Sequence, residues 1–370
     1  MIPRHLYVHV PFCARRCIYC DFSIAVRRTV PIDEFLDALV LELEHRSEHG
    51  SANSSPLETV YFGGGTPSRL GGEGVARMVA IVNQFHSIAA APEITLEANP
   101  DDVSAQNAER WATAGINRIS LGVQTFDDST LAWMHRTHSA AQARAAVAIA
   151  RCAGIQNISV DLIFALPGGL NRSWRDDLDE ALALEPDHIS LYGLTIERGT
   201  PLARLTASGA SALAGEDTYA EEFLLAHATA VAAGFEHYEV SNFARTGRRS
   251  RHNSAYWAGA QYLGIGPSAH SFDGERRSWN VSPYAEWVSR LAGGSSPEEG
   301  GETLSVSNRS AESIYLGLRT AKGYRAEAAD LDVARSWAGA GWAAIDDETV
   351  RLTPEGWLRL DSLAAGLTGF

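Results

Sequence analysis

Short apolar runs alternate with amphipathic segments of helical periodicity along the first two-thirds of the chain. Strands are expected at 5–10, 58–64, 93–99, 117–124, 157–168 and 187–194. Helices are expected at 33–46, 74–86, 104–114, 139–153 and 173–183. Strands that alternate with helices predict a parallel sheet with right-handed crossovers. The pattern favours an α/β fold, an incomplete (β/α)6 TIM-like barrel, with an open doubly wound sheet as the alternative.

Polar residues at or near the ends of these apolar strands favour the barrel. They are Glu97, Gln124 and Asp161. In barrels the carboxyl ends of the strands carry the chemistry. A cysteine-rich loop follows the first strand and the loop "GGGTPS" follows the second. All five features are therefore expected on one rim.

The pattern changes after about residue 200. A helix at 216–233 precedes a basic cluster and a glycine-rich run, and the polar stretch 293–305 is expected to be a linker. Helices near 309–320 and 325–337, a hairpin at 342–353 and a final helix at 354–367 predict a small α+β, winged-helix-like domain that acts as a cap or scaffold. We expect a partial barrel at 1–235, a barrel extension at 236–292 and the winged-helix-like domain at 306–370.

Charge and hydropathy exclude several classes of protein. The net charge of −14 argues against a nucleic-acid binder, which needs a basic surface. No apolar stretch approaches the ~20 residues that span a bilayer. The first strand begins too early to leave room for a signal peptide, so we expect a cytoplasmic protein. Four cysteines in such a chain indicate metal binding or catalysis rather than disulfides.

Three of the cysteines form a Cys-x3-Cys-x2-Cys cluster on the loop after the first strand. They are Cys13, Cys17 and Cys20. A structural zinc site would need a fourth ligand from elsewhere, such as His9. In a 4Fe–4S cluster each thiolate binds one iron, and three thiolates leave one iron open for a substrate or cofactor. Cys152, on a helix, is expected to be a small buried apolar residue.

This spacing, on the loop after the first strand of a partial barrel, resembles the radical S-adenosylmethionine (SAM) superfamily. Tyr19 fits the resemblance, because an aromatic residue commonly precedes the last cysteine in that family. The resemblance implies a 4Fe–4S cluster and SAM as cofactors. In that family the open iron chelates the amino and carboxylate groups of SAM, and an electron from the cluster cleaves the sulfonium to a 5′-deoxyadenosyl radical.

The order of the motifs narrows the resemblance. "GGGTP", "LEANP", "LGVQTF", "HR" and "DLIFALPG" follow one another as in the oxygen-independent coproporphyrinogen III oxidases and their relatives. Asp161 lies in so apolar a run that it needs a partner, and Arg136 would suit a carboxylate. By this resemblance the SAM site would comprise Tyr7, Tyr19, Gly64, Gly65, Thr66, Glu97, Gln124, Arg136 and Asp161.

Three departures separate the chain from the oxidases. Phe22 stands where the oxidases have a fourth cysteine, and only six residues precede Tyr7, where the oxidases have a long extension. The third departure, "RHNSAYW", resembles a branch of heme chaperones, and its candidate heme-binding residues are His252, Asn253, Tyr256 and Trp257. An imidazole for iron, aromatic rings for the macrocycle and the arginines 248, 249 and 251 for propionates would suit heme. His270 is a second candidate ligand.

Two functions are therefore open. One is a heme chaperone that uses the cluster and SAM while it hands heme to an acceptor protein. The other is an oxidase that decarboxylates coproporphyrinogen III to protoporphyrinogen IX by radical chemistry. The three departures favour the chaperone, and for either function a small protein of the flavodoxin type is a plausible electron donor to the cluster.

Overall fold

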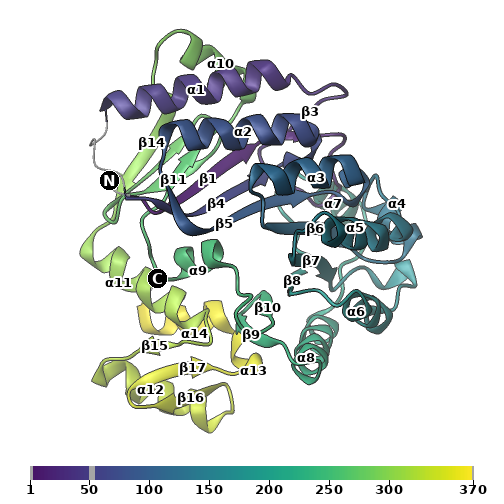
Figure 1. Ribbon diagram of the computed structural model, residues 1–370. Coiled ribbons are helices and arrows are strands. Elements are labelled where there is room, and N and C mark those ends of the chain that lie inside the picture. The colour runs from purple at the N-terminus through teal and green to yellow at the C-terminus, as the bar shows by residue number, and fades with distance from the viewer. Residues whose placement is uncertain (1–2, 50–54, 369–370) are drawn as a thin grey trace.

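A nine-stranded sheet forms the centre of the protein. The computed structural model describes residues 3–49 and 55–368. The strands follow the order β11-β1-β4-β5-β6-β7-β8-β10-β9 (Figure 1). The parallel strands that neighbour each other in chain order are β1 (His5–Val10), β4 (Leu57–Gly64), β5 (Ile88–Ala98), β6 (Arg118–Gln124), β7 (Asn157–Phe164) and β8 (His188–Gly193). The expected strand–helix repeat is confirmed.

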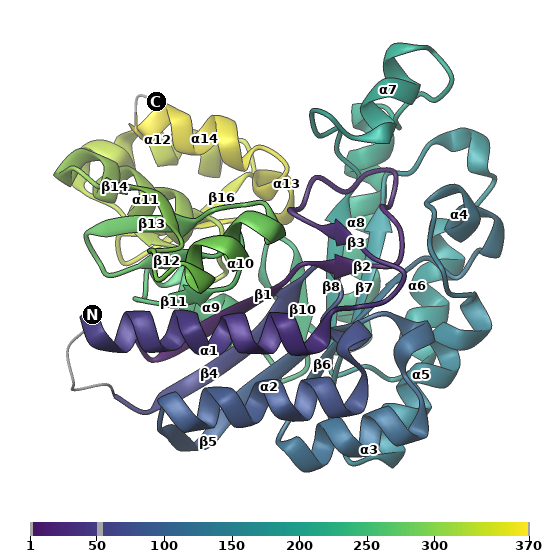
Figure 2. The same cartoon turned by 90° about the horizontal axis from the view of Figure 1, so that it is seen from above.

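Helices cover the outer face of this sheet (Figures 1 and 2). They are α1 (Ile32–His49), α2 (Gly71–Phe85), α3 (Ala105–Ala114), α5 (Ala140–Cys152), α6 (Trp174–Ala183) and α8 (Glu216–Ala232). Leu6 and Val8 of β1 are fully buried in the same core as Phe35 of α1. Burial of each such side chain stabilises the fold by roughly 1.5–3 kcal/mol. Consecutive strand order with one helical layer corresponds to a partial barrel rather than to a doubly wound sheet.

The inner face of the sheet is polar. Ser120 of β6 donates to Asp161 of β7 at 2.9 Å, and Ser159 hydrogen-bonds His188 of β8 at 2.8 Å. Tyr61 of β4 donates to Glu97 of β5 at 2.8 Å. The alternation along each strand therefore places apolar residues under the helices and hydrogen-bonding residues inside the barrel.

Segments after residue 235 extend both edges of the sheet. β11 (Leu263–Ile265) pairs in parallel with β1, while β10 (Asn242–Ala244) pairs antiparallel with β8 and β9 (Glu236–Glu239) follows it. A separate three-stranded sheet contains β12 (His270–Phe272), β13 (Arg276–Asn280) and β14 (Glu298–Thr303). The expected linker at 293–305 is therefore wrong, because β14 lies within it and pairs with β13.

The C-terminal module, residues 306–368, combines helices with a small sheet. Its elements are α11 (Val306–Leu318), β15 (Tyr324–Arg325), α12 (Ala328–Gly339), β16 (Ala343–Asp346), β17 (Thr349–Leu352), α13 (Pro354–Trp357) and α14 (Leu360–Thr368). The expected single final helix is wrong, because it is broken after Trp357. Trp357 also packs edge-on against His237 of β9, with 4.4 Å between ring centroids. Figure 1 shows this module on the inner side of the sheet, next to α9 (Arg251–Trp257).

The remaining elements are short. They are β2 (Phe12–Cys13), β3 (Ala25–Val26), α4 (Asp128–Trp133), α7 (Pro201–Ala207) and α10 (Tyr284–Ala292), with 3-10 turns at Pro67–Leu70, Pro100–Asp102 and Gly168–Leu170. Cys152 ends α5 and is exposed, so the expectation that it is buried is wrong. In the described part of the chain, no helix is both long and apolar enough to cross a membrane.

Candidate functional site

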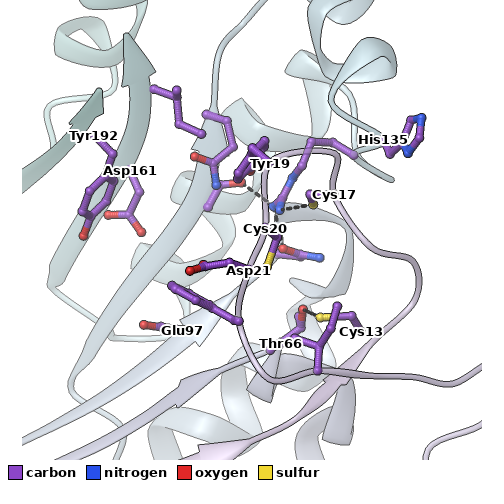
Figure 3. A pocket seen from close by; sticks show the side chains of 18 of the residues that line it. Cys13, Cys17, Tyr19, Cys20, Asp21, Thr66, Glu97, His135, Asp161 and Tyr192 are labelled. Carbon is purple, nitrogen blue, oxygen red and sulfur yellow. Dashed lines mark hydrogen bonds between the residues drawn. The ribbon is translucent and has the colours of Figure 1, made fainter. Parts of the chain in front are cut away.

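A cavity of about 540 Å³ lies at the rim formed by the carboxyl ends of the parallel strands (Figure 3). We call it the first cavity. Most of the residues expected to bind the cluster and SAM line it: Cys13, Cys17, Tyr19, Cys20, Gly64, Gly65, Thr66, Glu97, Gln124, Arg136 and Asp161. The fold therefore brings together residues that lie up to 148 positions apart, from Cys13 to Asp161.

The cysteine loop is fixed at its base by a short ladder. Phe12 and Cys13 of β2 pair with Ala25 and Val26 of β3. Figure 3 shows the three cysteines at different points around the loop. Burial raises the pKa of Cys13, and it raises that of Cys20 to about 11. Metal binding must therefore displace thiol protons here.

The donor set fits a 4Fe–4S cluster better than a zinc ion. A zinc ion gathers four ligands around one centre, whereas each thiolate of a cluster takes a different iron. Within residues 3–49 and 55–368, no three His, Cys, Asp or Glu side chains lie close enough together to hold one ion. His9 is not a fourth ligand, because its ring hydrogen-bonds Ser23 O at 2.9 Å and Tyr7 Oη at 3.1 Å. Three spaced thiols on one loop suit a cube with one open iron.

Arg136 connects the cysteine loop to the strand ends. Its Nη1 lies 3.6 Å from Cys17 Sγ, and its Nη2 donates to Asn99 Oδ1 at 2.6 Å and to Gly122 O at 2.8 Å. A Cβ on Gly122 would approach this guanidinium to 3.1 Å. Asn99 was missed as a site residue, although it lies within the "LEANP" motif. Arg136 therefore places a cation beside the thiols.

Glu97 is a carboxyl group held away from water. Its Oε1 accepts from Tyr61 Oη at 2.8 Å, and its Oε2 accepts from the backbone N–H of Gly64 at 3.0 Å. Burial raises the pKa of Glu97 to about 7, although both hydrogen bonds oppose the rise. The group therefore changes charge near neutral pH and can accept from a ribose hydroxyl or an amine when ionised.

Asp161 and Gln124 occupy different strand positions. Asp161 lies inside β7, which ends at Phe164, rather than at the end of the strand, yet it still lines the cavity. Burial raises the pKa of this carboxyl group while three serines hydrogen-bond it. Gln124 ends β6 with a φ of 71°, a left-handed conformation that is costly outside glycine and concentrated at functional sites.

The glycine loop after β4 is closely packed at Gly64. Gly64 has a φ of 111°, and a Cβ there would lie 2.6 Å from the ring of His9. Protein atoms therefore occupy that space, and the glycine is needed for packing. Thr66 nevertheless faces the site, with its Oγ1 3.5 Å from Cys13 Sγ.

Tyr7 lines a different cavity, of about 1010 Å³, which we call the second cavity. Its walls come from β1, α9, β12, β13 and the C-terminal helices α11 and α14. The ring of Tyr7 stacks on that of Tyr61, with centroids 6.2 Å apart. Tyr7 thus lies apart from the first cavity, which the other residues expected to bind SAM line.

The "RHNSAYW" motif forms helix α9, capped by Ser250. The last two residues of the motif, the aromatic Tyr256 and Trp257, line the second cavity. His252 does not: it is fully buried, with Nδ1 2.7 Å from Thr59 Oγ1 and Nε2 2.9 Å from Tyr256 Oη. Burial lowers the pKa of His252 to about 3. Asn253 does not line the cavity either.

The neighbouring arginines also lie away from the second cavity. Arg248 pairs with Asp187 at 3.5 Å and Arg249 with Glu236 at 2.9 Å. The guanidinium of Arg251 donates to Ala91 O at 2.8 Å. The expected grouping of these arginines with the aromatic residues is therefore wrong. His270, in contrast, lines the cavity.

Comparison with known proteins identifies the class. The model of the radical SAM superfamily matches residues 7–181. The heme chaperone HemW of Mycobacterium tuberculosis H37Rv is 36% identical, with 99% of this chain and 95% of that protein covered. HemW of Bacillus subtilis is 35% identical, with 86% and 83% covered. The chain belongs to the radical SAM superfamily and, within it, to the family of the HemW proteins. The family expected from the motifs is confirmed.

A solved structure shows the same fold. Coproporphyrinogen III oxidase (HemN) from Escherichia coli aligns with a TM-score of 0.82 at 21% identity, covering 98% of this chain and 89% of that chain. The likeness therefore includes the C-terminal module as well as the barrel. The expected radical SAM type of α/β fold is confirmed, and the superfamily implies a 4Fe–4S cluster and SAM.

Proposed function

We propose that this protein is a heme chaperone that binds a 4Fe–4S cluster, SAM and heme, and that transfers heme to an acceptor protein. One observation carries the proposal: the chain has a second, aromatic cavity beside the polar cavity at the cysteine loop. Tyr256 and Trp257 of the "RHNSAYW" motif line it, in a chain similar along nearly its whole length to heme chaperones. Two separate cavities suit a protein with both a cofactor and a cargo.

In this proposal the first cavity is the cofactor site. Cys13, Cys17 and Cys20 would hold the cluster, which supplies a low-potential electron and an open iron for the amino acid end of SAM. Glu97, Gln124 and Asp161 offer acceptors for hydroxyl and amino groups on the strand side of the cavity. Arg136 places a positive charge next to the sulfur atom of Cys17.

The alternative is oxidation of coproporphyrinogen III, because the same fold serves that oxidase. Phe22, at the position of the oxidases' fourth cysteine, is 59% exposed at the mouth of the first cavity. An anaerobically reconstituted sample should bind about one hemin per chain and form no protoporphyrinogen IX when given SAM, reductant and coproporphyrinogen III. Sustained turnover in that assay would instead establish the oxidase.

An acidic, flavodoxin-type protein is our proposed electron donor. Five arginines lie in the cysteine loop or next to its base, and we call them the arginine collar: Arg15, Arg16, Arg27, Arg28 and Arg69. Arg69 donates to the backbone carbonyls of Arg27 and Arg28, which keeps its part of the collar together. None of the five forms an ion pair with a described carboxylate, in contrast to Arg144 or Arg277. A cationic surface in a protein of net charge −14 attracts an acidic partner to the cluster.

The collar is tested by the rate at which a flavodoxin reduces the cluster. Replacing Arg15, Arg16, Arg27 and Arg28 by Gln should slow reduction and flatten its dependence on salt. Reduction by dithionite should be unchanged. The matched control also removes four positive charges, by replacing Arg325, Arg335, Arg351 and Arg359 of the C-terminal module by Gln. Equal rates for both sets of variants would refute the docking surface.

We also propose that the protein works in the cytoplasm, because a reducing compartment suits its free thiols. We expect no nucleic-acid partner, because the overall charge of the chain is acidic.

A further inference from the structure

The second cavity has the size and the aromatic side chains expected of a site for a large flat ligand. Its volume of about 1010 Å³ lies at the upper end for small-molecule sites. Aromatic rings come from three sides, with Tyr256 on α9, Phe272 on β12 and Tyr315 on α11. The C-terminal module therefore completes a wall that the barrel alone lacks.

Two histidines near this cavity are already engaged. Both ring nitrogens of His252 are hydrogen-bonded, and its side chain is fully buried behind Tyr256. His9 lines the cavity, but its ring nitrogens lie 3.1 Å from Tyr7 Oη and 2.9 Å from Ser23 O. Iron ligation by either residue would break a buried hydrogen bond, which costs about 1–3 kcal/mol. His252 instead acts on the cavity by positioning the Tyr256 hydroxyl.

His270 differs from both. It begins β12, is exposed and lines the second cavity. Its ring packs near Trp279, with 5.8 Å between centroids, and no hydrogen bond to its ring nitrogens is recorded within the described residues. Burial and the nearby Arg277 lower the pKa of His270, so the imidazole is neutral at physiological pH and has a free electron pair.

A buried donor also lacks a partner at this site. Trp257 lines the cavity, and its indole N–H is buried with no hydrogen-bond partner among the described residues. The guanidinium of Arg319 lies over the same indole ring, 4.2 Å from its centroid. An unpaired buried N–H is rare in folded proteins, and a ligand oxygen would satisfy it. A carboxylate is a suitable acceptor.

We infer that heme binds in the second cavity with a ring nitrogen of His270 as the axial ligand of its iron and the indole N–H of Trp257 donating to a propionate oxygen. The inference rests on the proposed function, which names heme as the cargo. It differs from the assignment that the motif alone suggests, because His252 becomes a positioning residue. The cavity also accounts for the C-terminal module, whose helices α11 and α14 would cover one side of the porphyrin.

The test compares hemin with metal-free protoporphyrin IX on the full-length, cluster-loaded protein. Only hemin can be ligated by His270, whereas both porphyrins carry propionates. His270→Ala should lower the affinity for hemin by about tenfold or more and leave that for protoporphyrin IX unchanged. Trp257→Phe should lower both affinities to the same extent. Added imidazole should restore the absorption and electron paramagnetic resonance signals of histidine-ligated heme in His270→Ala.

Two controls separate the possible failures. His135→Ala removes an exposed histidine that lines the first cavity. Loss of hemin binding in that variant alone would mean that heme binds in the first cavity, which would contradict the inference. Unchanged hemin affinity and spectrum in His270→Ala would refute the ligand while leaving the chaperone proposal intact. If His252→Gln lost the signals of histidine-ligated heme and His270→Ala kept them, His252 of the "RHNSAYW" motif would be the iron ligand instead. A wild-type protein that binds no hemin would refute both proposals.

Discussion

The two cavities of this protein are built in different ways. The first takes its side chains from the ends of consecutive strand–helix units: the cysteine loop after β1, the glycine loop after β4, Glu97 from β5 and Gln124 from β6. The second combines β1 with α9, β12, β13 and two helices of the C-terminal module. The first lining is rich in acids, thiols and amides, whereas the second combines six Tyr, Phe and Trp rings with alanines and a few charged groups.

This difference determines how freely the residues that line each cavity can change. A repeated unit brings every strand end to one rim, so the position of each motif along the chain already determines its neighbours. The second cavity depends on how a separate module packs against the barrel. Ligand choice in the second cavity can therefore change without disturbing the cofactor site.

The cavities nevertheless share a wall. A Cβ on Gly63 would lie 3.0 Å from the Tyr7 ring, which lines the second cavity, and 3.1 Å from Glu97 Oε1, which lines the first. Tyr7 and Glu97 thus both pack against Gly63, which lies between the two cavities. The independence of the two sites and their common wall can both be tested.

The largest effect should come from Cys17→Ser. Loss of one of three thiolates should abolish the reconstituted cluster, and SAM binding should be lost with it. Hemin affinity should stay within about twofold, because the second cavity contains none of the cysteines. Iron and sulfide analysis with hemin titration measures both results. Cys152→Ser, which removes the exposed cysteine on α5, is the matched control. Joint loss of cluster and heme binding in Cys17→Ser would mean that the cavities are not independent.

Gly63→Ala should have the next largest effect, and on both cavities together. The added methyl would lie 2.8 Å from the Tyr61 ring as well as against Tyr7 and Glu97, so these side chains must move. We expect SAM and hemin affinities each to fall roughly tenfold or more, since overpacking typically costs 1–3 kcal/mol. Isothermal titration of each ligand tests this. The control is Gly339→Ala on α12, whose Cβ would meet no atom within 4 Å and whose φ, like that of Gly63, is not positive. Loss of only one affinity in Gly63→Ala would contradict the shared wall.

The same contrast explains what could be predicted from the sequence. The six parallel strands and the first cavity follow from alternation and motif order, because each strand is long enough to show its pattern. β11 has only three residues and joins the sheet beside β1 through backbone hydrogen bonds. Backbone hydrogen bonds do not depend on the identity of the side chains, so the sequence could not predict this pairing. β14 is an exposed edge strand that reads "EEGGET", so polar residues on both faces resemble a linker.

The second cavity was harder to predict for a physical reason. The motif identified Tyr256 and Trp257, but the burial of His252 depends on Thr59, which is 193 residues away. Tyr315 and the helix that carries it reach the cavity only through the packing of the C-terminal module. Tertiary contacts between distant segments thus determine which residues of the motif face the ligand.

The third largest effect should be a pH dependence of SAM affinity that hemin affinity does not share. Because the pKa of Glu97 is about 7, its carboxyl group is mostly ionised at pH 8 and mostly protonated at pH 6. If the carboxylate accepts from SAM, SAM affinity should fall by up to about tenfold as the pH falls over that range. Glu97→Gln should bind SAM weakly with a flatter pH dependence. Hemin binding should show no such dependence on Glu97, and an identical SAM profile in the variant would exclude this role.

The smallest effect concerns the stability of the wall behind the second cavity. The folded-state pKa of His252, about 3, lies below its usual value of 6.5, because burial disfavours the imidazolium. Between these values the unfolded chain binds the proton and the folded chain does not, so this residue makes stability fall as the pH falls below 6.5. One such proton changes the free energy of unfolding by up to about 1.4 kcal/mol per pH unit.

His252→Gln should therefore be less stable at pH 7, where it loses the hydrogen bonds to Thr59 and Tyr256, but should lose less further stability on acidification. Urea titrations of the cluster-free protein at pH 7 and pH 5 measure both changes. His237→Gln is the matched comparison: the pKa of His237 is also lowered to about 3 by burial, but this residue lies beside Trp357 rather than behind Tyr256. The two variants should flatten the pH dependence alike, yet only His252→Gln should disturb the second cavity, because only His252 holds the hydroxyl of a residue that lines it.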